Sequence, residues 1–454
     1  MAFITMEDAK ASFNLFCCVY GIGTLSMPGN FSRAGPALGI VSMVFMAFAN
    51  VYGATVICRV MLLAPTSVKT YGDLGEWVLG TRGRYLTVVV QMASCLIVPC
   101  VFLVLGGTLL DGLFPNAFSS TTWSVLMAVT VMPVCLVPTL KEGAGVAFAD
   151  VIGIAVVVHG MCGHPSAPAP ELHLQQVIRA FGSLALANGS GVVIPSIHRQ
   201  HSDPKRMPRV VGVTIGTISV LFLVLASTAY SAVGCQISGY ILWTIYPSSA
   251  TGLTSLGFSP NWGAVVLAYL AMQVHITVAF SVILNPVFYL TERLVLGMHK
   301  RPVADVENNL LSYAEVSTPA EKPSPRSFSS VADTEKVQVG NAEAEAAEYH
   351  GANAIKYVGH FSALSDFVGA SCITLNSTIL PIVFLLKKKW GILPMWEKVA
   401  ALAVVVVCFC LGCYVTVLTG EELFTPVDDD TEFPYCAPEY ENVVYYNYTA
   451  AHEG

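Results

Sequence analysis

The sequence predicts an all-α polytopic membrane protein, and composition and charge spacing carry that prediction. Of its 454 residues, 54% are hydrophobic and only 12% are charged, whereas soluble domains carry about 25% charged residues. The mean hydropathy is +0.63. Long stretches contain no charged residue at all, among them 34–58, 85–110 and 112–140. A chain of this kind buries its surface in lipid, and we expect about ten crossings.

Each predicted span lies where the chain has enough consecutive apolar residues to cross a bilayer. A hydrocarbon core about 30 Å thick requires about 20 helical residues. The predicted spans are 11–30, 36–63, 85–110, 120–140, 143–162, 175–197, 209–233, 261–294, 364–386 and 397–419. The corresponding regions are an N-terminal cytoplasmic tail (1–10), spans one to eight (11–299), a loop (300–360), the last two spans (361–420) and a C-terminal tail (421–454).

Lys and Arg favour cytoplasmic loops, and here they alternate between loops. The loops that follow spans two, four, six and eight carry nearly all of them: Lys69, Arg82, Arg84, Lys141, Arg199, Lys205, Arg206, Arg209, Lys300 and Arg301. The sequence therefore predicts a cytoplasmic N-terminus, with even-numbered spans leaving the membrane on the cytoplasmic side.

The alternation breaks after the eighth span. That span exits to the cytoplasm, yet the next apolar segment, 364–386, ends at Lys387, Lys388 and Lys389, which also indicate the cytoplasm. Three alternatives remain: a crossing is missing between 300 and 363, the segment dips in and returns, or the lysines face outward. Residues 301–350 are rich in Glu, Ala, Ser and Pro, a disordered composition that supplies no span.

Two predicted spans contain a glycine-rich interruption followed by proline. The first reads Gly21-Ile22-Gly23-Thr24 and reaches Pro28, and the sixth reads Gly189-Ser190-Gly191 and reaches Pro195. Glycine adds backbone freedom, and proline removes a donor and clashes with the preceding turn. Unwound backbone persists in a membrane only where it lines a cavity or packs in protein.

A matched pair of interruptions, one in each half of the chain, predicts the substrate site of an inverted-repeat transporter. The amides at a half-helix N-terminus would hold a carboxylate, and the freed carbonyls would hold an ammonium group or a cation. The alternative is that each motif merely permits close helix packing or a proline kink.

The sequence resembles the amino acid/auxin permease family. The likeness lies in YGIGTLSMPGNFSRAGPALG of the first two spans, in FGSLALANGSGVVIPSIHRQHSDPKRMPRV (181–210), in FSVILNPVFYLTERL (280–294) and in DFVGASCITLNSTILPIVFLLKKK (366–389). It implies a LeuT-like five-plus-five inverted repeat plus one further helix, with discontinuous first and sixth helices. Against that pattern the chain lacks the ninth span, so an inactive variant or a mis-spliced transcript is an alternative.

The resemblance also implies transport of amino acids, commonly coupled to protons and sometimes to sodium. We expect the substrate to contact the backbone at the two interruptions, with added contacts from the Thr24 and Ser190 hydroxyls. The predicted substrate residues are Gly21, Ile22, Gly23, Thr24, Asn188, Gly189, Ser190 and Gly191.

Three residues of the eighth span are candidates for coupling-ion binding. Thr277 and Ser281 share one helix face at i, i+4 spacing, and the family's fold places such hydroxyls near a sodium ion. Each hydroxyl has an alternative partner, the carbonyl of its own helix. Histidine is the side chain that ordinarily titrates near neutral pH, so His275 is the proton candidate, and the alternative is a neutral histidine bonded to a neighbouring carbonyl. Asp150 and His159 form a second pair, but their spacing argues against direct contact.

Other classes of function are disfavoured. No basic patch with interleaved aromatics points to nucleic acid. The cysteines show no metal-ligand spacing with histidines, so we expect no metal and no cofactor. An enzyme would need clustered intramembrane ligands or acids, and this chain scatters them. The prediction is a proton-coupled transporter of small neutral amino acids in the plasma or vacuolar/lysosomal membrane, with an amino-acid sensor as the alternative.

Overall fold

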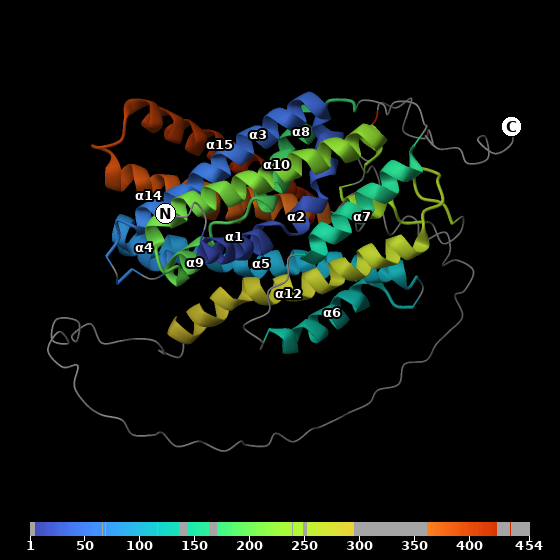
Figure 1. Ribbon diagram of the computed structural model, residues 1–454, viewed down its shortest axis with the longest axis horizontal. Helices are drawn as coiled ribbons and strands as arrows, with labels where there is room; N and C mark the ends of the chain where they lie inside the picture. Colours follow the sequence, from blue (N-terminus) through green and yellow to red (C-terminus); the bar gives the residue numbers. More distant parts are fainter. Residues whose placement is uncertain are drawn as a thin grey trace, which may run out of the picture.

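The computed structural model describes residues 5–135, 144–162, 170–247, 252–294 and 361–424, except 66, 69, 116 and 238, together with Cys436. These residues form a bundle of helices (Figure 1). The helices in chain order are α1 (Met6–Val19), α2 (Ile22–Leu25), α3 (Met27–Met61), α4 (Tyr71–Leu79), α5 (Thr81–Leu113), α6 (Ser120–Val134), α7 (Ala144–Gly160), α8 (Leu174–Ala187), α9 (Ile194–Gln200), α10 (Met207–Val233), α11 (Ile241–Thr244), α12 (Trp262–Leu294), α14 (Leu380–Lys389) and α15 (Met395–Phe424).

Every predicted span coincides with a helix or with a pair of half-helices. Six helical segments of the described chain are long and apolar enough to cross a membrane, and α6 and α7 are shorter apolar helices. The segment Phe361–Lys389 is one helical run that ends in α14 and contains two π-helical stretches. The sequence did not predict α4 or α11, because both are short and lie between spans.

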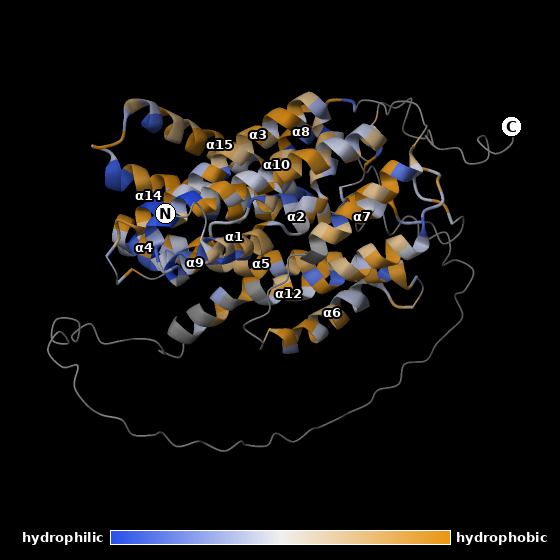
Figure 2. Cartoon of the chain, viewed as in Figure 1, coloured by the Kyte–Doolittle hydropathy of each residue, from blue (hydrophilic) through white to orange (hydrophobic). Residues whose placement is uncertain are grey.

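The outer surface of the bundle is apolar, as a lipid-facing surface must be. Val89, Val129 and Val220 point away from the bundle and are 63%, 64% and 61% exposed. Figure 2 shows hydrophobic residues along the length of α10, α14 and α15, whereas hydrophilic residues concentrate near the ends of the helices. This distribution agrees with a protein that crosses the bilayer several times.

Close helix contacts in the interior depend on glycine, because small residues let backbones approach in membranes. Gly369 faces α8, where a Cβ would lie 2.8 Å from the amide nitrogen of Leu186. Gly53 of α3 sits against the backbone at Ser377. The run Phe361–Lys389 is therefore wedged into the centre of the bundle.

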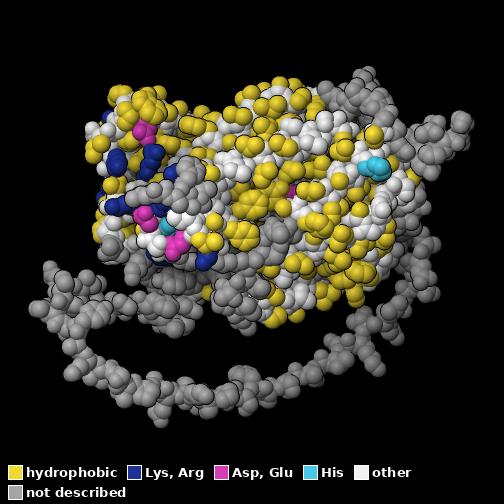
Figure 3. Space-filling view, in the orientation of Figure 1, with side chains coloured by type: hydrophobic (Ala, Val, Ile, Leu, Met, Phe, Trp, Pro, Cys, Tyr) yellow, Lys and Arg dark blue, Asp and Glu magenta, His cyan; other side chains and the backbone are white. Residues whose placement is uncertain are grey.

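One end of the bundle carries most of the visible positive charge, and Figure 3 shows Lys and Arg side chains gathered there. Ion pairs tie this end together. Arg59 at the end of α3 lies 3.3 Å from Glu397 at the start of α15, and Lys388 lies 3.8 Å above the Trp77 ring of α4. Positive charge at one end is what the predicted cytoplasmic face would carry.

The run Phe361–Lys389 crosses the whole bundle, which removes two of the three alternatives for the break in charge alternation. Phe361 packs on Tyr240 with ring centroids 4.7 Å apart, at the end opposite to Lys388. The segment therefore does not dip in and return, and its lysines do not face outward.

The chain on either side of 295–360 lies at opposite ends of the bundle. Figure 1 shows α12 ending on the side of α4 and α9, whereas the next described segment begins at Phe361, which packs on Tyr240. The predicted disordered loop and the absent ninth span both lie outside the described residues.

The C-terminal tail is attached to the end opposite the basic one. Arg179 at the start of α8 pairs with Glu422 near the end of α15 at 3.0 Å. Cys436 forms a disulfide with Cys235, just after α10. Disulfides persist in oxidising compartments, so we expect this end to be the one that faces the exterior or a lumen.

We therefore expect a tag fused after position 454 to resist protease added to sealed microsomes, because their lumen corresponds to this face. A tag before Met1 is the matched control, and it should be digested without detergent. Digestion of both tags in sealed vesicles would contradict the assignment of the two faces.

Candidate functional site

The first span is interrupted between α1 and α2. Tyr20 and Gly21 separate the two helices, and Gly21 has an extended backbone (φ −128°, ψ −157°). A further short turn ends at Ser26, and Pro28 then occupies the first turn of α3, where its missing N–H is not needed. The interruption leaves the last carbonyls of α1 and the first amides of α2 without helical partners.

The end of the first span is continuous with the second span. The helix α3 runs from Met27 to Met61 and bends at Gly35, where φ is +69°. Only glycine adopts this left-handed conformation readily. This bend turns the chain back toward the basic end of the bundle. The helix α3 therefore contributes the last part of span one and all of span two.

The sixth span is interrupted between α8 and α9, and polar side chains hold the interruption in place. Asn50 of α3 donates from Nδ2 to the Asn188 side-chain oxygen at 3.2 Å and accepts from the Ser190 hydroxyl at 3.2 Å. The Gly191 amide donates to the Ser377 hydroxyl at 3.0 Å. The unwound segment is thus packed in protein, as a membrane interior requires.

The two interruptions meet in the middle of the bundle. A Cβ on Gly23 would lie 2.6 Å from the Cβ of Ala187 and 2.9 Å from its amide nitrogen. The Thr24 hydroxyl is buried beside this contact and has no hydrogen-bond partner among the described residues. The discontinuity of both helices, predicted from glycine and proline, is confirmed.

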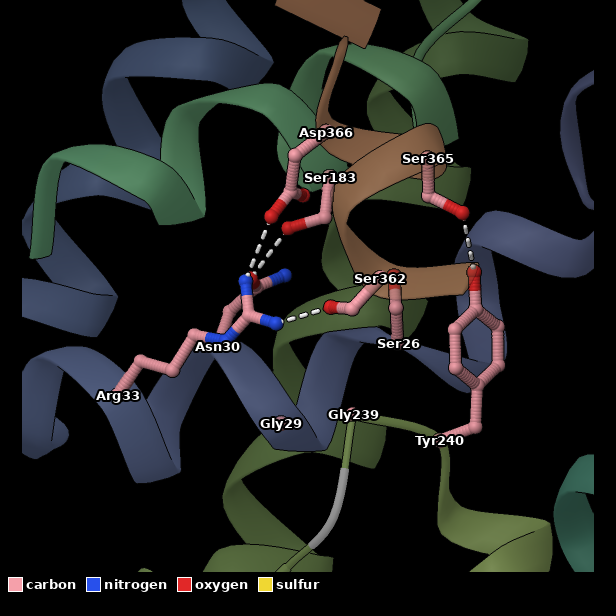
Figure 4. A pocket seen from close by; sticks show the side chains of 10 residues that line it. All are labelled: Ser26, Gly29, Asn30, Arg33, Ser183, Gly239, Tyr240, Ser362, Ser365 and Asp366. Carbon is pink, nitrogen blue, oxygen red and sulfur yellow. Dashed lines mark hydrogen bonds and ion pairs between the residues drawn. The ribbon is translucent and has the colours of Figure 1, made fainter. Parts of the chain in front are cut away.

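A small polar hollow lies just outward of the two interruptions (Figure 4). Its walls come from the start of α3, from α8, from the segment before α11 and from the start of Phe361–Lys389. The lining residues are Ser26, Gly29, Asn30, Arg33, Ser183, Gly239, Tyr240, Ser362, Ser365 and Asp366. None of the eight predicted substrate residues lines this hollow, and they lie immediately inward of it.

A buried ion pair closes the hollow. Arg33 Nη1 lies 2.8 Å from Asp366 Oδ2, and the two side chains are 7% and 3% exposed. Arg33 also donates to the Ser362 hydroxyl. Asn30 accepts a hydrogen bond from Ser183, whereas its Nδ2 has no hydrogen-bond partner among the described residues. The site therefore places a cation, an anion and a spare amide donor around one space.

The cytoplasmic end has its own polar link between α1 and the segment after α9. Asp8 of α1 is buried, and Arg206 Nε lies 3.1 and 3.0 Å from its two carboxylate oxygens. His201 Nε2 lies 3.1 Å from Asp8 Oδ1. The Arg206 guanidinium holds the pKa of the Asp8 carboxyl well below its usual range. Buried polar contacts therefore tie the helices together on both sides of the interruptions.

We expect Asp8→Asn to loosen the inner link and to expose α1 to the cytoplasm. The lowered pKa means that the charged link is complete above about pH 4, the ordinary value for Asp, and weakens only as the pH falls further. At pH 7 the variant should therefore react several-fold faster at Cys17 and Cys18 with a maleimide that cannot cross membranes. Lys10→Gln, at an exposed position on the same helix, is the matched control, and equal rates in both variants would contradict the prediction.

Of the predicted coupling residues, the structure brings only His275 to an interruption. A Cβ on Gly21 would lie 3.8 Å from His275 Nε2, and His275 is buried. Thr277 instead donates to Gln273 O of its own helix at 2.8 Å, the alternative foreseen for it. Ser281 donates to Val134 O of α6 at 3.3 Å.

The sequence motifs did not point to Arg33 and Asp366 as site residues. Both carried a usable signal, since Arg33 interrupts an otherwise charge-free stretch and Asp366 lies inside a predicted span. Ionisable residues at membrane depth are functional candidates by default. What the sequence did not show is that residues 333 positions apart face each other.

Comparison with known proteins decides the family. The family described as transmembrane amino acid transporter protein matches residues 7–317. The chain belongs to the transmembrane amino acid transporter family. This is a family of transporters rather than enzymes, and its members are multi-pass membrane proteins.

Curated relatives from Arabidopsis thaliana support this assignment. Amino acid transporter AVT3A is 23% identical over 319 residues, which cover 63% of this chain and 69% of the relative. Amino acid transporter AVT1D is 26% identical over 243 residues, 49% of this chain. The chain spans only 42% of the length of AVT1D.

A solved transporter structure shares the fold. A manganese transporter from Eremococcus coleocola aligns with a TM-score of 0.51 at 11% identity, covering 94% of this chain and 90% of that one. MhsT in complex with L-phenylalanine aligns with a TM-score of 0.47 at 12% identity, covering 92% and 98%. The fold is the LeuT-like inverted repeat with discontinuous first and sixth helices that the sequence predicted.

Proposed function

We propose that this amino acid transporter family member is a proton-coupled secondary active transporter of small neutral amino acids. The observation that carries the proposal is the polar hollow beside the two interruptions, which is lined by the Arg33–Asp366 ion pair. An amino acid zwitterion presents one carboxylate and one ammonium group, which match these two charges.

The substrate's polar groups have partners in the hollow and at the interruptions beneath it. The carboxylate pairs with Arg33 and the spare Asn30 amide, and the ammonium group pairs with Asp366. The substrate then moves inward to Gly21–Thr24 and Asn188–Gly191, where the first amides of α2 receive the carboxylate. Gly29 and Gly239 also line the hollow, which is small, so we expect a substrate with a small side chain.

Alternating access follows from the two links that close the ends of the path. Opening outward requires Arg33 and Asp366 to part, and opening inward requires Asp8 to leave His201 and Arg206. The half-helices α1 and α9 lie at the inner link, and the start of α3 with α8 lies at the outer hollow. Rocking of these elements about the contact between Gly23 and Ala187 exposes one end at a time.

The placement of hydroxyls favours a proton over sodium as the coupling ion. Thr277 and Ser281 already donate to carbonyl oxygens away from the first interruption. A titratable side chain, His275, lies beside Gly21. Sodium coupling would instead require these hydroxyls to turn toward the interruption.

Uptake by proteoliposomes against a panel of amino acids, under imposed proton and sodium gradients, tests the proposal. We expect accumulation of small neutral amino acids when the outside is acidic, with no requirement for sodium. Binding of an amino acid without any flux would favour a sensor instead. Protein that is correctly inserted but neither binds nor exchanges any amino acid would be an inactive variant and would contradict the proposal.

A further inference from the structure

A buried carboxyl group lies beside the first interruption, and the proposed substrate path does not use it. Asp150 of α7 is 1% exposed, within the membrane-spanning part of the bundle. The hydroxyl of Tyr20, the residue that ends α1, hydrogen-bonds with its carboxyl group. The second carboxyl oxygen, Oδ2, has no hydrogen-bond partner among the described residues.

Among the side chains that the structure describes, the elements packed around α7 bring no arginine or lysine into contact with Asp150. On α12 the titratable side chains with described surroundings are Tyr269, which donates to Leu242 O, and His275, which faces Gly21. On α10 they are Arg209 and Tyr230, near the two ends of that helix. The short helices α2 and α11 carry none.

A carboxylate without a cation beside it is expensive in such surroundings, so a proton on Oδ2 stabilises the closed arrangement. When water reaches the site, it solvates and stabilises the charged carboxylate, and the proton leaves. The same carboxyl touches Tyr20, which sits directly before Gly21 at the interruption. A change in the charge of Asp150 therefore alters its contact with the end of α1, the helix that must move for the inner end to open.

We propose that Asp150 binds the coupling proton and that Tyr20 connects its protonation to the movement of α1. The inference rests on the proposed transport function and names the group that couples it. The step is a single proton transfer: a proton from water on the outer side adds to the carboxylate and later returns to water on the cytoplasmic side. No other bond forms or breaks.

The test compares two kinds of transport by reconstituted protein. Exchange of internal for external amino acid needs no net proton movement, whereas accumulation against a gradient does. Asp150→Asn keeps a neutral side chain of the same shape, so we expect proton-driven accumulation to fall at least ~10-fold while exchange continues. Lys10→Gln, exposed on α1, is the control and should change neither.

If the wild-type protein does not exchange amino acids, the proposed transport function is wrong. The Asp150 inference is tested separately, by comparing variants of a protein that does exchange them. Normal proton-driven accumulation by Asp150→Asn overturns the inference. Loss of accumulation in His275→Asn but not in Asp150→Asn also overturns it and assigns the proton to His275.

A second variant applies if Asp150→Asn does not fold. Tyr20→Phe removes the hydrogen bond between the Tyr20 hydroxyl and the Asp150 carboxyl group, so the pH midpoint of uptake should shift by about half a unit to one unit. An unchanged midpoint in Tyr20→Phe overturns the inference as well.

Discussion

Gly23→Leu is expected to abolish uptake while the protein still reaches the membrane. Even the first carbon of a side chain at this position would lie 2.6 Å from the Cβ of Ala187 and 2.9 Å from its amide nitrogen. The neighbouring atoms belong largely to backbone, so they cannot rotate away. The two interruptions would be pushed apart at the point where we propose that they pivot.

The size of the effect follows from the strain of overpacking. Adding a single methyl group to a well-packed interior costs about 1–3 kcal/mol, which corresponds to a roughly 5- to 150-fold change in an equilibrium population. Gly23→Ala should therefore reduce uptake within that range, and the larger leucine should remove it. Initial rates of uptake per inserted protein are the measurement.

Gly216→Leu is the matched control for Gly23→Leu. Gly216 lies within α10, another membrane helix, and a Cβ there would meet nothing within 4 Å. Uptake should be normal in this variant. Equal uptake by Gly23→Leu and Gly216→Leu would remove the contact between the two interruptions from the mechanism.

Gly191→Leu should behave like Gly23→Leu for a related reason. A Cβ on Gly191 would lie 2.7 Å from the Cα of Ser377, whose hydroxyl also accepts the Gly191 amide. The substitution would displace the sixth-span interruption from the helix that supports it. Loss of uptake with normal insertion is the expected result, and wild-type rates would show that this segment does not need its close packing.

The membrane architecture could be predicted because its causes are local. Lipid imposes a minimum length and an apolar composition on each span, and both are visible in a single segment. The interruptions were also predictable, because the backbone freedom of Gly21 and Gly23 and the geometry of Pro28 are properties of the residues themselves. The sixth span was predictable for the same reason, because glycines in Asn188–Gly191 are followed by Pro195.

Juxtapositions across the bundle could not be predicted in the same way. The partners of Arg33 and Asp150 depend on how helices rotate about their axes, which is set by packing between distant segments. Thr277 and His275 show how sensitive this is. They are two residues apart, yet the Thr277 hydroxyl bonds its own helix while His275 faces the first interruption.

Asp366→Asn and Arg33→Gln should each eliminate nearly all uptake. Both side chains are almost fully buried, so neutralising one leaves the other as an unpaired charge in the membrane. Breaking a buried pair in this way costs about 3–5 kcal/mol, a factor of roughly 10² to 10³ or more in any equilibrium that requires the closed outer end. Uptake at saturating and at low substrate concentration should be measured for both variants.

The double variant, Arg33→Gln with Asp366→Asn, separates a binding role from a structural one. Replacing both members of a buried pair is often neutral for folding, because no charge remains unpaired. Thermal stability should therefore recover in the double variant relative to either single one, a coupling that a double-mutant cycle measures. Uptake should not recover, because the zwitterion has lost both of its charged partners. A double variant that regained wild-type uptake together with its stability would show that Arg33 and Asp366 only brace the fold, and the substrate's charges would then have to be met elsewhere.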